Sequence, residues 1–460
     1  MTMTSKNLSR RQFLVGVAGT AGAALLASCG PAEKPALSPA AQATSAPQSA
    51  ATKPAAPVPT TASAPVTLSY PNWMLGEAGV GDYWKATVAE FEKQNPGVTL
   101  KTTLIPSNQY EDKTLTDMAG GQIPDIYPAF TNQLPRLITE GLLEPLDPWL
   151  SKAPWKDKEL PVIQIAQRDG KTYGVVLTAS PQGMIYNKQL LDRAGVTKIP
   201  EDVESFYQAV KQVKQKTGEF GYGFPTLSAE ELNAYIVTMQ WVLGYGSDWS
   251  DKDGKPTAND PKTIEGMTWI KRFLDEDLAP KGMKVLDLRN MFKDGKLAFM
   301  FEGPWVLTLV KASNAQIYPY VGFTRPPTPT HASITGGAFF TIPKGSKHKE
   351  IAWKYIDMVN QESWQRKWLE ENVQLPGQAI KPGEQFLKEN PWVNDMVEVA
   401  AQYQAGFGYA PPSAKLAVRA AEFRKIVMSH VDEIYAGKVS VKDGCNQIQS
   451  ELEAFVAKIR

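Results

Sequence analysis

Val66-Thr67-Leu68-Ser69-Tyr70 begins a series of alternating strands and helices from which the fold class of this chain follows. Apolar and polar residues alternate in this stretch and again in residues 98–104, which predicts two strands. Residues 84–91 carry apolar side chains at helical spacing, and a second helix is expected over 110–119, before a third strand at 124–127. A β-α-β-α-β order is typical of a parallel sheet flanked by helices, and so of an α/β protein.

The loops after the first and third strands are the expected places for a ligand. In open α/β sheets, ligands bind beyond the carboxyl ends of the strands. These ends lead here into the loop at Trp73 and into the segment Phe130-Thr131-Asn132. We therefore expect Trp73 and Asn132 to lie at the edge of a ligand site.

The rest of the chain continues the mixture of strands and helices. The tail from Ala414 is expected to form two helical pieces, the second capped by Ser440. Cys445 is expected to be a small packing residue near the start of that last helix. Further strands are expected at 173–177, 183–187, 296–301 and 338–342.

Length and charge limit the class of protein. Roughly 395 residues follow Pro65, which is too many for one compact core and predicts two domains. The formal net charge is +1, so nothing in the composition indicates a nucleic-acid partner or a polyanionic substrate.

The N-terminus carries an export signal. Ser9-Arg10-Arg11-Gln12-Phe13-Leu14 resembles a twin-arginine motif, and Leu26-Ala27-Ser28-Cys29 resembles a bacterial lipobox, in which the cysteine is acylated. The apolar run from Val15 to Leu26 is about half of the ~20 residues that a membrane-spanning helix needs. We expect 1–29 to be a signal peptide and Cys29 to anchor the mature protein to the outer face of the cytoplasmic membrane.

Residues 30–65 are expected to be a disordered tether. They consist mainly of Ala, Pro, Ser and Thr and contain no aromatic residue. Such a stretch cannot bury enough apolar surface to offset its ordering entropy. It would hold the folded body close to the membrane.

The order of short motifs along the body resembles the family 1 extracellular solute-binding proteins, the carbohydrate-type receptors of ABC importers. No single motif is specific for this family, but the order and spacing of the motifs together are. The motifs are Asn95-Pro96-Gly97, Pro124-Asp125-Ile126, Leu142-Leu143-Glu144-Pro145-Leu146-Asp147, Tyr186-Asn187-Lys188, Ala194-Gly195-Val196, Phe292-Lys293-Asp294-Gly295-Lys296, Gly303-Pro304-Trp305 and Gly336-Gly337.

The resemblance implies a two-lobed, type II periplasmic-binding-protein-like fold, with a ligand cleft between the lobes and a multi-strand hinge. Lobe one would comprise 66–181 and 331–375, and lobe two 185–330 and 376–460. Closure around a solute follows from its higher affinity for the closed state. The hinge would lie near Gln182-Gly183, Thr324-Arg325 and Pro376-Gly377.

The family places an aromatic side chain at the position of Trp305 for stacking on a sugar ring, although a tryptophan there could also cap the sheet. Asn132 stands where the family often has a polar ligand contact. Trp73 would lie at the cleft edge or in the core. Members that bind maltodextrin also have a stacking tryptophan near the C-terminus, whereas residues 412–416 contain none, which argues against maltodextrin.

Four further residues are candidates, some of which also have a purely structural interpretation. Gln182 would face the cleft at the crossover between lobes. Gly337 could let backbone approach the ligand or form a tight turn. Trp241 could line the cleft, but its apolar helix favours the core, and Glu302 could bind hydroxyl groups or cap a turn.

An enzyme is the main alternative class, and we expect none. No carboxylate pair is singled out by a motif, and no Gly-x-Ser-x-Gly elbow appears where a hydrolase needs it. The histidines, His331, His348 and His430, have no metal-binding spacing, so neither a metal nor a cofactor is expected. A secreted carbohydrate-active enzyme, a receptor for a non-sugar solute and a structural envelope lipoprotein stay open.

The expected partners are a small solute of the carbohydrate class, the transmembrane subunits of an ABC permease and the membrane through the lipid anchor. The protein is expected to act as a monomer. The sequence does not name the sugar, the permease or the type of envelope.

Overall fold

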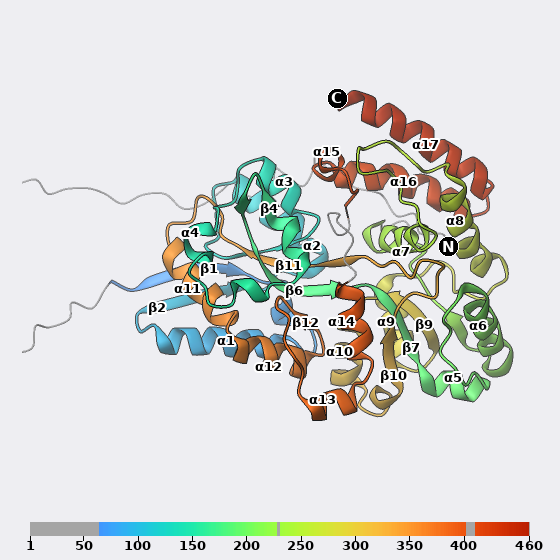
Figure 1. The fold of residues 1–460 in the computed structure, drawn as a ribbon, viewed down its shortest axis with the longest axis horizontal. Coiled ribbons are helices and arrows are strands. Elements are labelled where there is room, and N and C mark those ends of the chain that lie inside the picture. Colours follow the sequence, from blue (N-terminus) through green and yellow to red (C-terminus); the bar gives the residue numbers. More distant parts are fainter. Residues whose placement is uncertain (1–63, 228–230, 402–409, 460) are drawn as a thin grey trace, which may run out of the picture. The chain divides into compact units, whose positions relative to one another are not determined.

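The computed structural model describes residues 64–227, 231–401 and 410–459 of the chain. The expectations for the export signal at Arg10 and Arg11, lipidation at Cys29 and the tether over 30–65 therefore lie outside the described residues, apart from the last two tether positions. Two four-stranded sheets with helices around them make up most of the described chain (Figure 1).

The first sheet has the strand order β12-β6-β11-β3. Strand β11 (Thr335–Thr341) pairs antiparallel with both β3 (Tyr127–Phe130) and β6 (Val175–Pro181), and β6 also pairs antiparallel with β12 (Leu375–Pro376). Strands β1 (Val66–Pro71) and β2 (Val98–Thr103) form a separate parallel pair. This pair adjoins β3, because the amides of Asp125 and Ile126 both donate to the carbonyl oxygen of Ser69.

Short and long helices surround the first sheet and the β1–β2 pair. The small hairpin β4 (Gln167–Arg168) and β5 (Lys171–Thr172) lies in the chain directly before β6. The helices are η1 (Trp73–Gly76), α1 (Gly81–Gln94), α2 (Ser107–Ala119), α3 (Leu134–Thr139), α4 (Asp147–Leu150), η2 (Lys156–Lys158), η3 (Pro161–Ala166), α11 (Lys349–Val359) and α12 (Glu362–Asn372).

The second sheet has the strand order β10-β7-β9-β8. Strand β7 (Gly183–Asn187) pairs antiparallel with β9 (Leu297–Glu302) and β10 (Val321–Thr324), and β8 (Phe220–Tyr222) is parallel to β9. Its helices are α5 (Lys188–Ala194), α6 (Val203–Thr217), α7 (Glu231–Gly244), α8 (Pro261–Asp275), α9 (Val285–Lys293), α10 (Trp305–Ser313) and η5 (Tyr318–Tyr320). The C-terminal helices are α13 (Glu384–Glu389), α14 (Val393–Ala401), α15 (Ala414–Ala417), α16 (Ala420–Tyr435) and α17 (Val441–Lys458).

The alternation of strands and helices was predicted correctly, but the parallel sheet holds for only two pairs. Strands β1–β2 and β8–β9 are parallel, whereas every pairing in the first sheet is antiparallel. The reason is strand β11, which follows the strands of the second sheet in the sequence but pairs in the first sheet. It inserts between β3 and β6 and runs against both of them.

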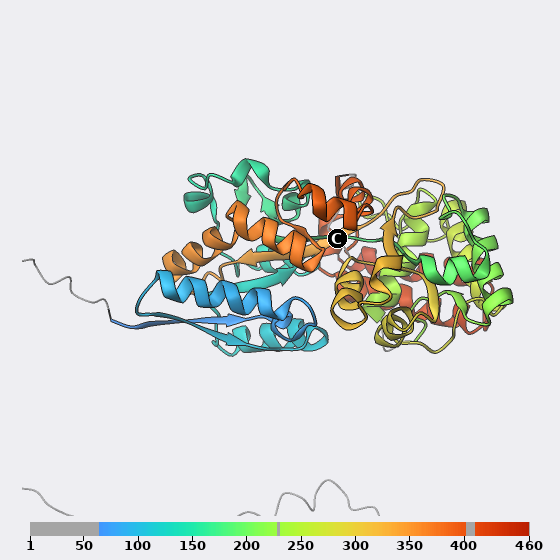
Figure 2. The same cartoon turned by 90° about the horizontal axis from the view of Figure 1, so that it is seen from below.

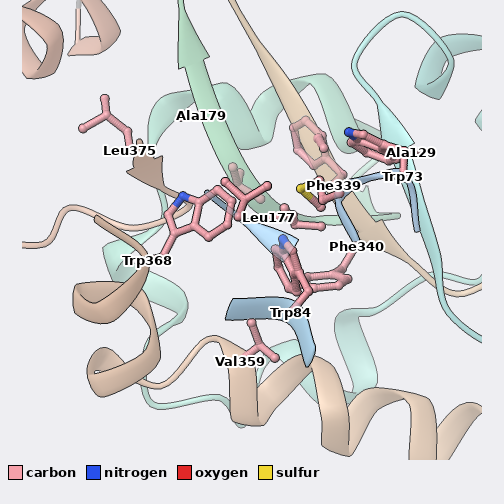
Figure 3. Packing of buried hydrophobic residues seen from close by; sticks show 14 of the residues in the cluster. Trp73, Trp84, Ala129, Leu177, Ala179, Phe339, Phe340, Val359, Trp368 and Leu375 are labelled. Carbon is pink, nitrogen blue, oxygen red and sulfur yellow. The ribbon is translucent and has the colours of Figure 1, made fainter. Parts of the chain in front are cut away.

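Aromatic residues fill the core beneath the first sheet, as Figure 3 shows. The ring of Trp84 on α1 lies 5.3 Å from that of Trp368 on α12 and 5.9 Å from that of Phe340 on β11. The hydroxyl of Tyr83 donates to the carbonyl oxygen of Trp364 at 3.0 Å. These contacts hold α1 beside the late helix α12 and strand β11, and α1 also packs against α11, an arrangement visible in Figure 2.

The C-terminal end follows the prediction from sequence. Ser440 caps α17, since its Oγ accepts a hydrogen bond from the amide of Asp443 at 3.1 Å. Cys445 is buried, and burial raises the pKa of its thiol to about 12, which fits an inert packing residue. In the described ranges, no helix combines the length and the apolar character needed to cross a bilayer.

Candidate functional site

Trp305 stands at the junction between the buried strand β9 and helix α10. Gly303 and Pro304 form the turn, and the indole ring folds back over Gly303. A Cβ atom at Gly303 would lie 2.0 Å from Cζ3 of the ring, so glycine is required for this position of the indole. The side chain of Trp305 is partly exposed, while its Nε1 is buried and has no hydrogen-bond partner among the described residues. A partly open indole held over backbone is suited to stacking on an apolar ligand face.

Arg289 and Glu302 form a partly buried ion pair beside Trp305. Nε and Nη2 of Arg289 lie 2.9 and 2.8 Å from Oε2 of Glu302, whose other oxygen accepts from the amide of Gly303 at 3.3 Å. Cζ of Arg289 is 5.7 Å from the centroid of the Trp305 ring. Glu302 was expected either to bind ligand hydroxyl groups or to cap a turn; in the structure its carboxylate accepts from the amide of Gly303 in the turn and pairs with Arg289.

Glu77, directly after η1, adds a third charge near Arg289. Its side chain keeps contact with solvent, but the protein packed around it removes hydration and raises its pKa to about 7, an effect that the charge of Arg289 opposes. An exposed carboxylate at this position is a group that a polar ligand can reach.

Trp73 lies mainly in the core. Only 6% of its surface is exposed, and its ring packs 4.7 Å from Tyr110 and 4.2 Å from Phe130, between α2 and β3. Asn72 fixes the turn before it, because its Oδ1 caps η1 by accepting from the amide of Met74 at 2.9 Å. Trp73 therefore supports the strand end to which it belongs.

Asn132 lines a cavity of about 380 Å³, which we call the α2–α16 cavity. Its Nδ2 donates to Oε2 of Glu111 on α2 at 3.2 Å. Segments distant in sequence meet here, since one wall belongs to α2 and α3 and the other to α15 and α16. The lining residues are Glu111, Leu115, Asn132, Gln133, Arg136, Leu137, Glu140, Ala417, Val418, Arg419, Ala420, Ala421, Glu422 and Arg424.

Gln182 lies where the chain passes from the first sheet to the second. Its amide donates to the carbonyl oxygen of Ile334 at 2.8 Å, and its carbonyl accepts from Oγ of Ser333 on the returning segment. Buried Gln240 on α7 holds the returning segment in place, because its Oε1 accepts from the backbone amide of Ile334 at 3.3 Å. The two crossing segments are thus bonded together at the position predicted for a hinge.

Gly337 and Trp241 contribute to packing inside the protein. A Cβ atom at Gly337 would lie 2.2 Å from the carbonyl oxygen of Thr178, so the approach that requires glycine is between β11 and β6. Trp241 has no exposed surface and packs among Phe206, Phe273 and Phe301. Its Nε1 donates to the hydroxyl of Tyr222 at 3.1 Å.

The structure thus groups the candidates in three places. Trp305 and Glu302 lie together, Asn132 lies on the α2–α16 cavity, and Gln182 lies at the crossover. The described residues contain no group of three His, Cys, Asp or Glu side chains close enough to hold a metal ion. Sequence reasoning missed Glu77, Glu111, Arg289 and Gln240, because a charged or amide residue on an ordinary helix or loop has no local motif.

Comparison with known sequences gives several relatives that are described as binding proteins. The sequence profile of the bacterial extracellular solute-binding proteins matches residues 86–377. A protein of Brucella abortus, described only as a binding protein, is 30% identical over 306 residues, which is 65% of this chain and 73% of the relative. The diacetylchitobiose-binding protein DasA of Streptomyces coelicolor is 22% identical over 394 residues, or 82% and 87% of the two chains.

Solved structures show the same fold. The maltose-bound MalE3 protein of T. maritima has a TM-score of 0.75 at 18% identity, with 85% of this chain and all of that chain covered. The GacH receptor of Streptomyces glaucescens has a TM-score of 0.72 at 20% identity, covering 84% and 97%. The fold is therefore the two-lobed α/β fold of the type II periplasmic binding proteins. Together with the profile match, it shows that the chain belongs to the bacterial extracellular solute-binding protein family.

Proposed function

We propose that this protein is the substrate-binding lipoprotein of an ABC importer, and that it captures a sugar or a related polyhydroxylated solute for a membrane permease. The observation that carries the proposal is the partly exposed indole of Trp305, which is folded over Gly303 next to the fixed guanidinium of Arg289. A flat apolar face beside charged hydrogen-bonding groups suits a sugar, whose ring has apolar faces and polar edges.

The relatives support a saccharide as the solute. The names of several relatives include diacetylchitobiose, maltodextrin and maltotriose as their ligands. The polar lining of the α2–α16 cavity is in keeping with this class, since its carboxylate, amide and guanidinium groups can pair with hydroxyl groups.

Binding would act through lobe closure, with lobe one at 66–181 and 331–375 and lobe two at 185–330 and 376–460. A solute that contacts both lobes only in the closed state shifts the population toward that state by its differential affinity. A change from 1:99 to 99:1 requires about 5.5 kcal/mol of such preference. The bonded crossover of Gln182, Ser333 and Gln240 is the expected pivot.

The test is a saccharide panel that includes cellobiose, chitobiose, diacetylchitobiose, maltose and longer oligosaccharides. A saccharide present at 100 times its Kd adds about 2.7 kcal/mol of stability, which a thermal-shift assay detects. A panel in which no saccharide raises the melting temperature contradicts the sugar assignment. Chromatography of the incubated saccharide separates receptor from enzyme, because a receptor returns it unchanged.

The lipid anchor is tested on the full chain. Cys29→Ser should release the protein from the membrane fraction into the soluble fraction, because acylation at Cys29 supplies the two chains that stable anchoring needs. Retention of the Cys29→Ser variant on the membrane contradicts the anchor and leaves the binding function untouched.

A further inference from the structure

Helix α10 supplies the C-terminal cap of helix α12. The last carbonyl groups of a helix have no partner inside it and need donors from elsewhere. Nζ of Lys311 on α10 lies 3.1 and 3.0 Å from the carbonyl oxygens of Glu370 and Glu371. The hydroxyl of Thr308, about one turn earlier on α10, donates to the carbonyl oxygen of Asn372. The end of α12 is therefore bonded by side chains of a different helix.

This cap joins the two proposed lobes. Helix α10 belongs to the part of lobe two at 185–330, and α12 belongs to the part of lobe one at 331–375. Thr308 also accepts a hydrogen bond from Nε2 of Gln374 at 3.2 Å, and both side chains are buried. The loop before α1 approaches the same residue, because a Cβ atom at Gly79 would lie 2.8 Å from Cγ2 of Thr308. Thr308 of lobe two thus contacts two segments of lobe one.

Val373 directly follows α12 and has a strained backbone. Its φ of 56° lies in the left-handed region, which is unfavourable for a β-branched residue. Its side chain has no exposed surface, and its amide donates to the carbonyl oxygen of Leu369 at 2.9 Å. Strain of this kind persists only where the surroundings fix it. The bonds of Thr308 with Asn372 and Gln374, the two neighbours of Val373, contribute to this fixation.

The bonds between α10 and α12 occur in an arrangement that brings the walls of the α2–α16 cavity together. Helix α15 packs against α3, and both walls line the cavity. In the proposed division, α3 belongs to lobe one and α15 to lobe two, so this is a closed arrangement. A bond between the lobes stabilises the arrangement that contains it relative to one in which the bonded groups have moved apart.

We infer that Thr308 and Lys311 form a latch between the lobes, which favours the closed arrangement and thereby increases the affinity for the solute. The inference rests on the proposed function, because lobe closure around a solute is the mechanism proposed there. The apparent Kd of a solute increases as the closed fraction of the free protein decreases. Both are positioning residues, since they act through α12 and the crossover that follows it.

The test measures the separation of the lobes without any solute. Spin labels attached at Thr139→Cys on α3 and Lys425→Cys on α16, both exposed positions, report the distance between the cavity walls in the full chain. Cys445 is buried and Cys29 is expected to carry lipid, so neither takes a label. Thr308→Val keeps the shape of the side chain and removes its donor, so the distances should become longer than in the labelled wild type. Thr308→Ser keeps the hydroxyl and should retain the wild-type distances.

Thr238→Val is the matched control. Thr238 on α7 is as buried as Thr308, but its hydroxyl donates within its own helix, to the carbonyl oxygens of Ala234 and Tyr235 at 3.1 and 2.9 Å. Thr238→Val should therefore lower the melting temperature without changing the distance between the labels. This control separates a general loss of stability from the loss of a contact between the lobes.

Calorimetry with cellobiose, maltose and diacetylchitobiose gives a second measurement. For each of these saccharides that the wild type binds, Thr308→Val should weaken binding by roughly 3- to 10-fold, the effect of losing about one hydrogen bond from the closed state. Thr308→Ser and Thr238→Val should bind like the wild type.

Each outcome bears on the inference. Wild-type distances in Thr308→Val overturn the latch and leave the proposed function standing. If the wild type binds no saccharide, the sugar assignment fails, while the distances between the labels still decide about the latch. If Thr308→Val does not fold, Lys311→Met takes its place, because Lys311 is partly exposed and its loss removes the other half of the cap. Longer distances then support the latch, and unchanged distances overturn it.

Discussion

The indole of Trp305 occupies the space in which a side chain at Gly303 would lie, with ring atoms Cζ3 and Cη2 only 2.0 and 2.2 Å from the position of a Cβ atom. The two residues therefore depend on each other, because the ring of Trp305 can pack on the backbone of Gly303 only when residue 303 has no side chain. This relationship explains why the turn after β9 has glycine and not another small residue.

Gly303→Ala should displace the indole and weaken saccharide binding by roughly tenfold, which corresponds to about 1.4 kcal/mol. The added methyl group cannot coexist with the present ring position, so the ring must rotate. Calorimetry with the saccharide of highest affinity in the panel measures the effect. Gly120→Ala is the control, because a Cβ atom there meets no atom closer than 3.4 Å. Equal affinities of Gly303→Ala and wild type would show that the ring position is unimportant.

Trp305→Ala should mainly weaken ligand binding, whereas Trp241→Ala should mainly destabilise the fold. Trp305 is partly exposed, so its loss should reduce affinity by about 2 kcal/mol with a small change in melting temperature. Trp241 is fully buried among aromatic rings, so its loss should cost about 3–5 kcal/mol of unfolding free energy. Chemical denaturation and calorimetry on both variants measure the two quantities. Unchanged affinity of Trp305→Ala would remove it from the site.

Arg289→Met should destabilise the protein by about 3–5 kcal/mol, because it leaves the buried carboxylate of Glu302 without its cation. The double variant Arg289→Met with Glu302→Gln should recover much of this loss, since no buried charge then remains. Denaturant titration of the two single variants and the double variant gives the coupling free energy between the side chains of Arg289 and Glu302. Additive effects of the two substitutions would mean that the ion pair contributes nothing beyond its separate members.

The sequence predicted well those elements whose signal comes from residues that are neighbours in the chain. The alternation in Val66–Pro71 and the cap at Ser440 are local patterns, and both appear in the structure. The antiparallel place of β11 was missed because its pairing joins Phe339 to Val176 and Ala129, which are far away in the chain. For an isolated strand, periodicity indicates its existence but not its direction.

The same distinction applies to the candidate site. Trp305 became a candidate because the Gly-Pro-Trp turn matches a motif of the family that the sequence resembles, and Asn132 because it follows a strand end. Arg289 and Glu111 lie on amphipathic helices, where a charged residue normally faces solvent. Only the folded chain shows that Arg289 reaches Glu302 and that Glu111 reaches Asn132.

Glu159 predicts a pH dependence of stability. Its carboxyl group lies beneath the segment after β12, where Oε2 accepts from the amide of Val176 at 3.3 Å and the backbone pairs with that of Gln378. Oε1 of Glu159 and Oε1 of Gln378 are both buried without a hydrogen-bond partner in the described chain. Burial raises the pKa of Glu159 well above its ordinary value, and the bond from Val176 only partly opposes this. Folding therefore favours the protonated form of this carboxyl group.

Glu159→Gln should remove this pH dependence. A carboxyl group whose pKa is raised by folding contributes its full stability below the pKa of the unfolded chain, and that contribution is lost as the pH rises through the folded-state pKa. Glutamine stays neutral throughout, so the variant should gain melting temperature relative to the wild type from mildly acidic to alkaline pH. Asp157→Asn, a nearby exposed carboxylate, is the control and should follow the wild type. A constant difference between Glu159→Gln and wild type at every pH would show that Glu159 is ionised in the folded protein already at the acidic end.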